Sequence, residues 1–175
     1  RGLSVRELVA LGRAPHSRHL GSVDKDAEDV IRDALEACEL SSLADRDATE
    51  LSGGERQRAH LAMAMAQQPR ILLLDEPVSA LDIHHQLETL ELVRRLSRER
   101  ELTVGVVLHD LNQARRYADD AVVLESGKVV AQGPVLDTIT ADLASQVFRC
   151  IANTVQARDD TDLLVFEVKP SSTVR

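Results

Sequence analysis

The chain has 175 residues, 43% of them hydrophobic and 29% charged, which is the composition of an ordinary globular protein. The 29 acidic side chains outnumber the 21 basic ones and give a net charge of −8, so we expect no broad attraction to nucleic acid or to an anionic membrane. One tyrosine and two phenylalanines are too few for a base-stacking surface, and no apolar run approaches the roughly 20 residues that span a bilayer.

The cysteines indicate the redox environment of the chain, and the first residue bears on where the chain starts. Cys38 and Cys150 lack the spacing of a metal site, and we expect them to be reduced thiols of a cytosolic protein. The first residue is Arg1 rather than methionine, and residues 3–11 already predict structure. We therefore expect that the chain begins within a longer protein, or that it was processed or cloned short.

The first third of the chain predicts helices joined by polar loops. Ser4 and Glu7 have the spacing of a capping box, which predicts a short helix starting there. Apolar side chains recur at three- and four-residue steps over residues 24–38, which is typical of an amphipathic helix. Residues 15–22 and 41–50 predict loops.

A second capping box begins the next helix, and strands follow it. Ser52 and Glu55 predict a helix start, and the Ala- and Met-rich stretch continues to about residue 67, before Pro69. Two continuous apolar runs, 71–74 and 103–108, are typical of buried parallel strands. Asp82 can cap the helix that lies between them.

The last third predicts short elements. We expect helices over residues 111–117 and 142–148, a hairpin of strands 121–124 and 128–131 around Ser126-Gly127, and a pairing of strands 154–156 and 163–168. The tail from Pro170 is expected to fray.

A short glycine-containing segment, Ser52-Gly53-Gly54, stands at the start of the second capped helix. The first turn of a helix has backbone N–H groups without intrahelical acceptors and a partial positive charge. Gly53 and Gly54 leave those groups open to an anion, Ser52 adds a hydroxyl, and Arg56 and Arg58 add positive charge. The alternative is an ordinary capped helix start.

Two carboxylates follow the first apolar strand. Side chains at the carboxyl end of a parallel strand emerge where α/β folds bind ligands. Asp75 there could hold Mg²⁺, and Glu76 could orient or deprotonate an attacking water. The alternative is a pair of solvated acids.

Histidines occur in several places, and one is a candidate for chemistry. His109 follows the strand 103–108 and is expected at the same sheet edge as Asp75, where a neutral imidazole could bond a phosphate. His84 and His85 are adjacent, so they diverge on a helix, and we expect them to make a poor chelate. His16 and His19 lie in a loop without acidic or cysteine partners, and we expect no metal there either.

The order of these motifs resembles the ATP-binding cassette (ABC) ATPase family. Leu51-Ser52-Gly53-Gly54-Glu55 is similar to its signature motif, residues 71–76 to Walker B with the catalytic glutamate, residues 79–82 to the D-loop and His109 to the switch histidine. The resemblance implies an α/β, partial P-loop NTPase fold with a parallel sheet core.

The family's site residues carry over to this chain motif by motif. Glu76 and His109 would be catalytic and Asp75 would bind Mg²⁺. Nucleotide contacts, with ATP as the nucleotide, would come from five residues: Ser52, Gly53, Gly54, Glu55 and Asp82. In the family, the signature of one cassette completes the ATP site of a second cassette.

The resemblance extends to one branch of the family. Residues 5–16, 81–86 and 109–119 look like the branch that imports iron-siderophore complexes, haem and cobalamin, and we expect iron-siderophore import. This resemblance implies a helical subdomain, residues 1–51, that docks on a membrane permease through the surface near residues 13–20. Residues 52–175 would form the RecA-like catalytic part. Expected partners are a second ABC subunit, the permease and, indirectly, a substrate-binding protein, with the chain peripheral on the cytoplasmic face of the membrane and no nucleic acid.

One family motif is absent from the sequence. A P-loop reads G-x-x-x-x-G-K-[ST], and the single Gly-Lys pair, Gly127-Lys128, is followed by Val129 in a predicted hairpin. We expect a gap in the sheet beside residues 71–74, and no ATP hydrolysis by this chain alone. Two alternatives remain: an ABC ATPase of DNA repair or chromosome structure, and a short cassette that serves only as a dimer partner.

Overall fold

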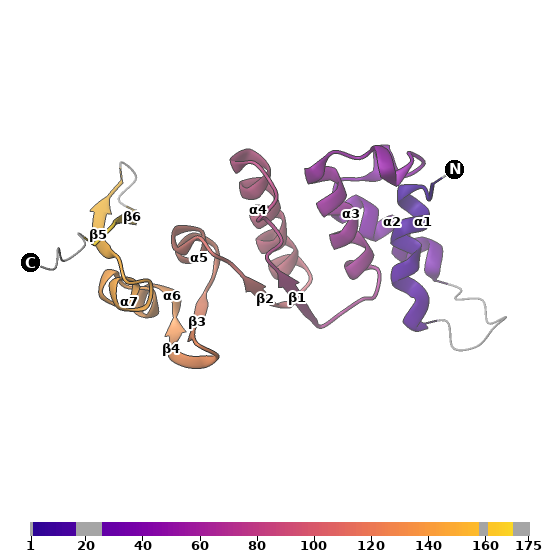
Figure 1. Cartoon of the computed structure of the whole chain (residues 1–175). Coiled ribbons are helices and arrows are strands. Elements are labelled where there is room, and N and C mark those ends of the chain that lie inside the picture. The colour runs from indigo at the N-terminus through magenta and orange to yellow at the C-terminus, as the bar shows by residue number, and fades with distance from the viewer. Residues whose placement is uncertain (1, 17–25, 158–160, 170–175) are drawn as a thin grey trace, which may run out of the picture. The chain divides into compact units, whose positions relative to one another are not determined.

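The computed structural model describes residues 2–16, 26–157 and 161–169 (Figure 1). Contacts divide the chain into two compact units, Arg1–Val107 and Leu108–Arg175, and each is described by itself. The predicted boundary at residues 51 and 52 falls inside the first unit, because helices on both sides of it share one hydrophobic core. As a division into family subdomains, that boundary stays a prediction.

Three helices open the first unit. Helix α1 (Val5–Ala10) begins with the predicted capping box: the Glu7 N–H donates to Ser4 Oγ at 3.2 Å, and the Ser4 N–H donates to Glu7 Oε2 at 2.7 Å. Helix α2 (Ala27–Ala37) covers most of the predicted amphipathic segment, and residues 24 and 25 lie outside the described part. Helix α3 (Gly53–Met65) is shorter than expected, ending before Gln67. A 3₁₀ helix (Leu11–His16) runs into the loop predicted from residue 15, and two 3₁₀ turns (Ser41–Leu43, Ala48–Glu50) lie in the loop predicted over residues 41–50.

Helix α3 lies in the middle of this unit, against α1, α2 and α4 (Figure 1). Ala59, Ala62 and Ala66 are fully buried, so the neighbouring backbones approach closely. Gly12 shows how close this packing is, because a Cβ there would lie 2.0 Å from the Met63 carbonyl oxygen. Small residues at these positions are therefore a steric requirement.

The carboxyl end of α3 is held by side chains from the chain segment after α1. Arg13 Nη1 donates to the Ala66 carbonyl at 2.8 Å and to Gln68 Oε1 at 3.0 Å, and His16 Nε2 lies 2.9 Å from the Gln67 carbonyl. A cation here satisfies carbonyls that lack intrahelical donors and complements the helix dipole. Arg13 is only 7% exposed, so it is a structural residue and not part of the docking surface we expected near residues 13–20. Residues 17–20 of that segment, His19 included, lie outside the described part.

A short parallel sheet and a long helix complete the first unit. Strands β1 (Ile71–Asp75) and β2 (Thr103–Val107) pair in parallel as predicted, with Asp75 opposite Val107. Helix α4 (Ile83–Glu99) connects them and begins at Asp82, whose side chain accepts from the His85 N–H at 3.0 Å. One βαβ unit is thereby formed.

The sheet is buried on one face alone, which corrects the expectation of strands buried on both faces. Leu72 is 5% exposed and packs in the core, whereas Ile71 and Leu73 are 62% and 78% exposed. In this two-stranded sheet the helices of the unit cover one side, and successive side chains point to opposite sides. The gap that we expected beside residues 71–74 stays a prediction.

The second unit is built from two hairpins and three short helices. Helix α5 (Leu111–Tyr117) has its predicted bounds. Strands β3 (Asp120–Glu125) and β4 (Lys128–Pro134) form the predicted antiparallel hairpin, and Gly127 has a φ of 77° in its turn. The Gly127-Lys128 pair is thus part of a hairpin, as expected.

The remaining elements fold around a small core of Val135, Ile139, Ala144, Ala152 and Leu164. They are α6 (Val135–Thr138), α7 (Ala141–Val147) and the antiparallel pair β5 (Ile151–Gln156) and β6 (Asp162–Glu167). The pairing of β5 with β6 was predicted. Helix α6 was missed, because a single four-residue turn has no periodicity to detect.

No helix in the described ranges is both long and apolar enough to cross a bilayer.

The packing at Gly12 gives a stability prediction. Gly12→Ala should lower the free energy of unfolding by about 1–3 kcal/mol, because the new methyl meets backbone that cannot move aside. Urea denaturation followed by circular dichroism measures this. Gly53→Ala is the matched control: its Cβ would lie 3.4 Å from the flexible Leu81 Cδ2, so it should be neutral or slightly stabilising. Equal stability of both variants would show that the 3₁₀ helix carrying Gly12 and α3 do not pack this closely.

Candidate functional site

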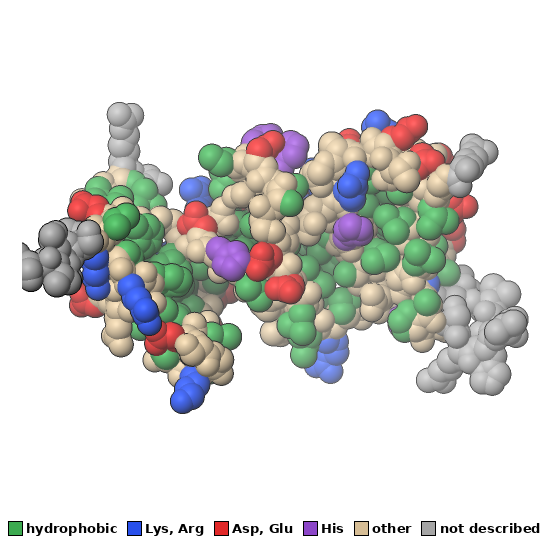
Figure 2. Space-filling view, viewed as in Figure 1, with side chains coloured by type: hydrophobic (Ala, Val, Ile, Leu, Met, Phe, Trp, Pro, Cys, Tyr) green, Lys and Arg blue, Asp and Glu red, His purple; other side chains and the backbone are tan. Residues whose placement is uncertain are grey.

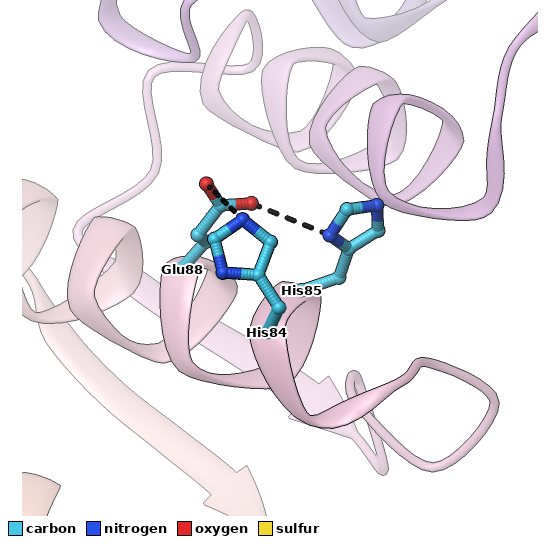
Figure 3. A group of neighbouring side chains, drawn as sticks. All are labelled: His84, His85 and Glu88. Atoms are coloured by element: carbon cyan, nitrogen blue, oxygen red, sulfur yellow. Dashed lines mark ion pairs between the residues drawn. The ribbon is translucent and has the colours of Figure 1, made fainter.

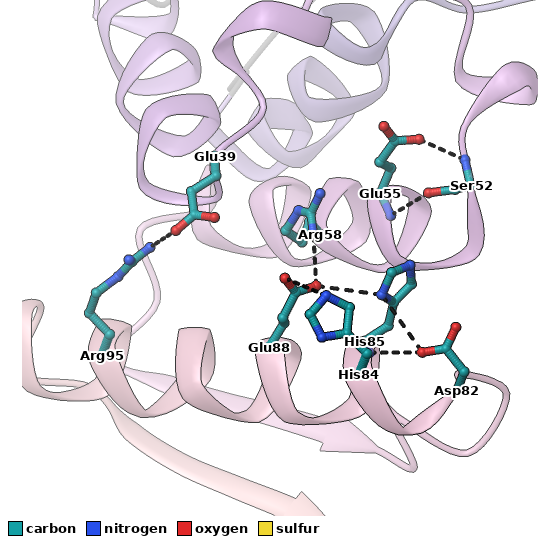
Figure 4. A network of polar contacts seen from close by, with 9 residues as sticks. All are labelled: Glu39, Ser52, Glu55, Arg58, Asp82, His84, His85, Glu88 and Arg95. Carbon is teal, nitrogen blue, oxygen red and sulfur yellow. Dashed lines mark hydrogen bonds and ion pairs between the residues drawn. The ribbon is translucent and has the colours of Figure 1, made fainter.

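The predicted anion-contacting helix start is present. Ser52 precedes α3 in an extended conformation, and a reciprocal pair of hydrogen bonds joins Ser52 and Glu55 (Figure 4). Hydrogen bonds from Ser52 lower the pKa of the Glu55 carboxyl below its usual value. This contribution to stability is present above the ordinary carboxyl pKa and is lost as the pH falls through the lowered value.

The first turn of α3 remains accessible at its tip. The first intrahelical bond runs from the Arg56 N–H to the Ser52 carbonyl at 2.9 Å, so the N–H groups of Gly53 and Gly54 precede it. Ser52 and Gly53 are exposed, and Gly54 is buried. The geometry fits an anion that approaches the tip from solvent.

The two arginines expected to enhance this positive field each have a partner, one at the start of α3 and one on α4. Arg56 Nη2 donates to the Leu51 carbonyl at 3.2 Å, and Arg58 Nη1 lies 4.0 Å from Glu88 Oε2 on α4 (Figure 4). The Arg56 guanidinium therefore lies beside the start of α3, bonded to the residue before Ser52, whereas Arg58 is paired with α4.

The tertiary structure brings the start of α4 against the start of α3. A Cβ on Gly53 would lie 3.4 Å from Leu81 Cδ2, and a Cβ on Gly54 would lie 2.8 Å from His85 Cδ2. Asp82 caps α4 at this place, and the hydrogen bond from the His85 N–H lowers the pKa of its carboxyl. The signature-like and D-loop-like segments are therefore neighbours within one unit.

Asp75 and Glu76 stand exposed at the carboxyl end of β1. Glu76 has a φ of 47°, a left-handed conformation that is unusual for a residue with a side chain. Its carbonyl accepts from the Ser79 N–H at 3.3 Å and from Ser79 Oγ at 3.1 Å, which closes a turn containing Pro77. Sequence reasoning missed this strained backbone, a feature that clusters at functional sites.

His109 is exposed and lies in the second compact unit. The strand that leads to it ends level with Asp75, because Val107 pairs with that residue. Its proximity to Asp75 and Glu76 stays a prediction.

Asn112, three residues after His109, ties helix α5 to the rest of the second unit. Asn112 Nδ2 donates to the Leu164 carbonyl at 2.9 Å, and the Leu164 N–H donates to Asn112 Oδ1 at 2.8 Å. Asp110 caps the same helix by accepting from the N–H groups of Asn112 and Gln113. The Asn112 link has no signal in the sequence, since its partner lies 52 residues away.

Comparison with known families decides the assignment. Residues 2–79, which contain the Ser52 helix start and the Asp75-Glu76 strand end, match the family described as ABC transporter. Residues 2–79 of this chain form an ABC transporter family domain. The resemblance inferred from the motif order is therefore confirmed by the family match. The ATP-binding proteins of that family are ATPases.

Curated ABC relatives cover most of this chain. The ferric enterobactin transport ATP-binding protein FepC of Escherichia coli (strain K12) is 46% identical over 151 residues, which are 85% of this chain and 56% of the relative. The iron(3+)-hydroxamate import ATP-binding protein FhuC of Bacillus subtilis (strain 168) is 43% identical over 88% of this chain and 57% of the relative. The chain thus spans a little over half the length of these relatives.

Solved ABC structures confirm the fold. A structure described as an inward-facing conformation of a proposed metal-chelate type ABC transporter superposes with a TM-score of 0.85 at 27% identity, over 99% of this chain and 69% of that one. The ATP-binding cassette MJ1267 in its ADP conformation gives a TM-score of 0.70 at 21% identity, over 84% of this chain and 61% of that one, and supports the fold alone.

The strained backbone at Glu76 gives a second prediction. Glu76→Gly should raise the free energy of unfolding by about 1 kcal/mol, because glycine adopts the left-handed region without steric cost. Glu101, with a φ of 50° after α4, is the matched control, and Glu101→Gly should give a similar gain in thermal denaturation. Stabilisation by Glu101→Gly together with destabilisation by Glu76→Gly would show that the Glu76 side chain stabilises the turn more than its backbone strains it.

Proposed function

We propose that this chain is part of the ATP-hydrolysing subunit of a bacterial ABC importer for iron-siderophore complexes. The observation that carries the proposal is the accessible, capped helix start at Ser52 in the same unit as the exposed Asp75-Glu76 strand end. The names of the relatives, ferric enterobactin transport and iron(3+)-hydroxamate import, support the substrate class.

The proposed roles follow from the chemistry of each group. Asp75 offers an exposed carboxylate oxygen, the ligand type that Mg²⁺ prefers, and bound Mg²⁺ would neutralise phosphate charge. Glu76 would orient or deprotonate the attacking water, and His109 would bond the γ-phosphate. These assignments rest on motif position in the sequence.

The Ser52 helix start would act on a second subunit's nucleotide. Ser52, Gly53, Gly54 and Glu55 would contact ATP held by the partner cassette, and Asp82 would lie at the contact between subunits. The closeness of Gly53 to Leu81 supports this pairing, because one surface then carries both segments. A dimer of cassettes would work with a membrane permease on the cytoplasmic face, and a substrate-binding protein would act through that permease.

The experiment is a chimera. The FepC segment that precedes the matched region is joined to this chain, and ATP turnover is measured with Mg²⁺. We expect the chimera to hydrolyse ATP, and Glu76→Gln to lower kcat by about a hundredfold or more, as loss of a general base does. Glu101→Gln, an exposed glutamate after α4, is the control and should leave kcat unchanged.

Two further measurements sharpen the result. The 175-residue chain alone should show no turnover, because its sequence holds no G-x-x-x-x-G-K-[ST] loop to grip the phosphates. The chimera should also restore growth of FepC-deficient Escherichia coli on ferric enterobactin. A folded chimera without Glu76-dependent turnover would refute the catalytic assignment, and turnover without growth would refute the substrate class.

A further inference from the structure

Three side chains with metal-binding atoms converge on the first two turns of α4. His84 Nε2 lies 3.2 Å from Glu88 Oε1, and His85 Nδ1 lies 3.5 Å from Glu88 Oε2 (Figure 3). One potential ligand atom from each of the three lies within 4.8 Å of the others. Histidine and acidic side chains lie together on the surface over α4 in Figure 2.

The prediction that His84 and His85 make a poor chelate considered the two histidines alone and left out Glu88, which lies one helical turn later. Each residue advances about 100° around an α-helix, so Glu88 comes back to about 40° from His84 and about 60° from His85, one turn later. Its carboxylate lies between the two rings and has one oxygen for each.

The His85 ring is held in place by the neighbouring helix. It packs where a Cβ of residue 54 would be, so Gly54 is what allows it to lie against α3. Its Nδ1 is buried and makes no hydrogen bond, although it faces Glu88. A polar nitrogen that is desolvated, fixed and without a hydrogen bond is available to a cation at little further cost in ordering.

We propose that His84, His85 and Glu88 form a binding site for one divalent transition-metal ion. Two imidazoles and a carboxylate suit borderline ions such as Zn²⁺, Co²⁺ and Ni²⁺, and do not suit Mg²⁺, which prefers oxygen ligands. Ligand atoms around tetrahedral Zn²⁺ are about 3.3–3.5 Å apart. The two short distances from Glu88 involve different carboxylate oxygens, so one ion would take both oxygens or require a rotation of the carboxylate. The His84 side chain is 75% exposed, so its ring can rotate and bring its nitrogen closer to the other two ligand atoms, which lie within 4.8 Å of it. Water would complete the coordination.

Arg58 sets the strength of this site. Its Nη1 lies 4.0 Å from Glu88 Oε2, and its Nε is buried without a hydrogen bond (Figure 4). A guanidinium this close both competes for the carboxylate and repels a cation. Removing its charge should therefore tighten metal binding, an effect opposite to that of removing a ligand.

The test is calorimetric titration of the tag-free 175-residue chain with ZnCl₂, with and without excess MgCl₂. We expect saturable binding of one Zn²⁺ per chain that Mg²⁺ does not displace, and a rise in the thermal unfolding midpoint with Zn²⁺, because the ion binds the folded state. His84→Ala and Glu88→Gln should each weaken binding by at least about tenfold, the loss that even outer-sphere changes typically cause. Arg58→Gln should strengthen it several-fold.

His60→Ala is the matched control, since His60 is an exposed histidine on α3 outside the cluster. Circular dichroism of each variant verifies that its helices are intact; His84 is largely exposed and Glu88→Gln is isosteric, so both should fold. Absence of saturable Zn²⁺ binding, or binding that His84→Ala and Glu88→Gln leave unchanged, would overturn the proposal. No gain with Arg58→Gln would place the ion away from Glu88 and overturn the assignment of that ligand.

Discussion

The burial of helix α3 is the constraint on which the first unit depends. Its alanines allow α1, α2 and α4 to approach within backbone contact, and Gly12 has no room for even a methyl group. Close packing of this kind gains dispersion energy and leaves little freedom to shift. Arg13 and His16 contact the Ala66 and Gln67 carbonyls at its carboxyl end. These contacts restrict movement of α3 along its axis, in addition to the packing on its sides.

That fixed helix controls the chemistry at its other end. The accessible turn at Ser52 and Gly53 is rigid because the rest of α3 is in the core, and Leu81 and His85 pack beside it. Two distinct functions meet there: the proposed contact to a partner's nucleotide and the proposed metal site at His84, His85 and Glu88. In both, a glycine at the start of α3 leaves space for a residue at or just before the start of α4: Gly53 for Leu81, and Gly54 for His85.

Local rules predicted much of the fold. Both capping boxes, the cap at Asp82, helix α5 and the two hairpins follow from residues within a few positions of each other, and the structure has all of them. Exposure was less predictable. The apolar run at residues 71–74 reads as fully buried, yet alternate side chains are open to solvent, because burial depends on which elements cover the sheet.

The sequence by itself determined where the helices and strands begin and which chemical groups stand at their ends, because capping, periodicity and motif spacing act over short separations. Only the tertiary structure showed that Arg13 caps another helix, that Asn112 binds a strand 52 residues away, and that His85 lies against Gly54. Each of these contacts joins residues far apart in the chain. Their energies depend on distances that packing sets, and no local pattern in the sequence encodes those distances.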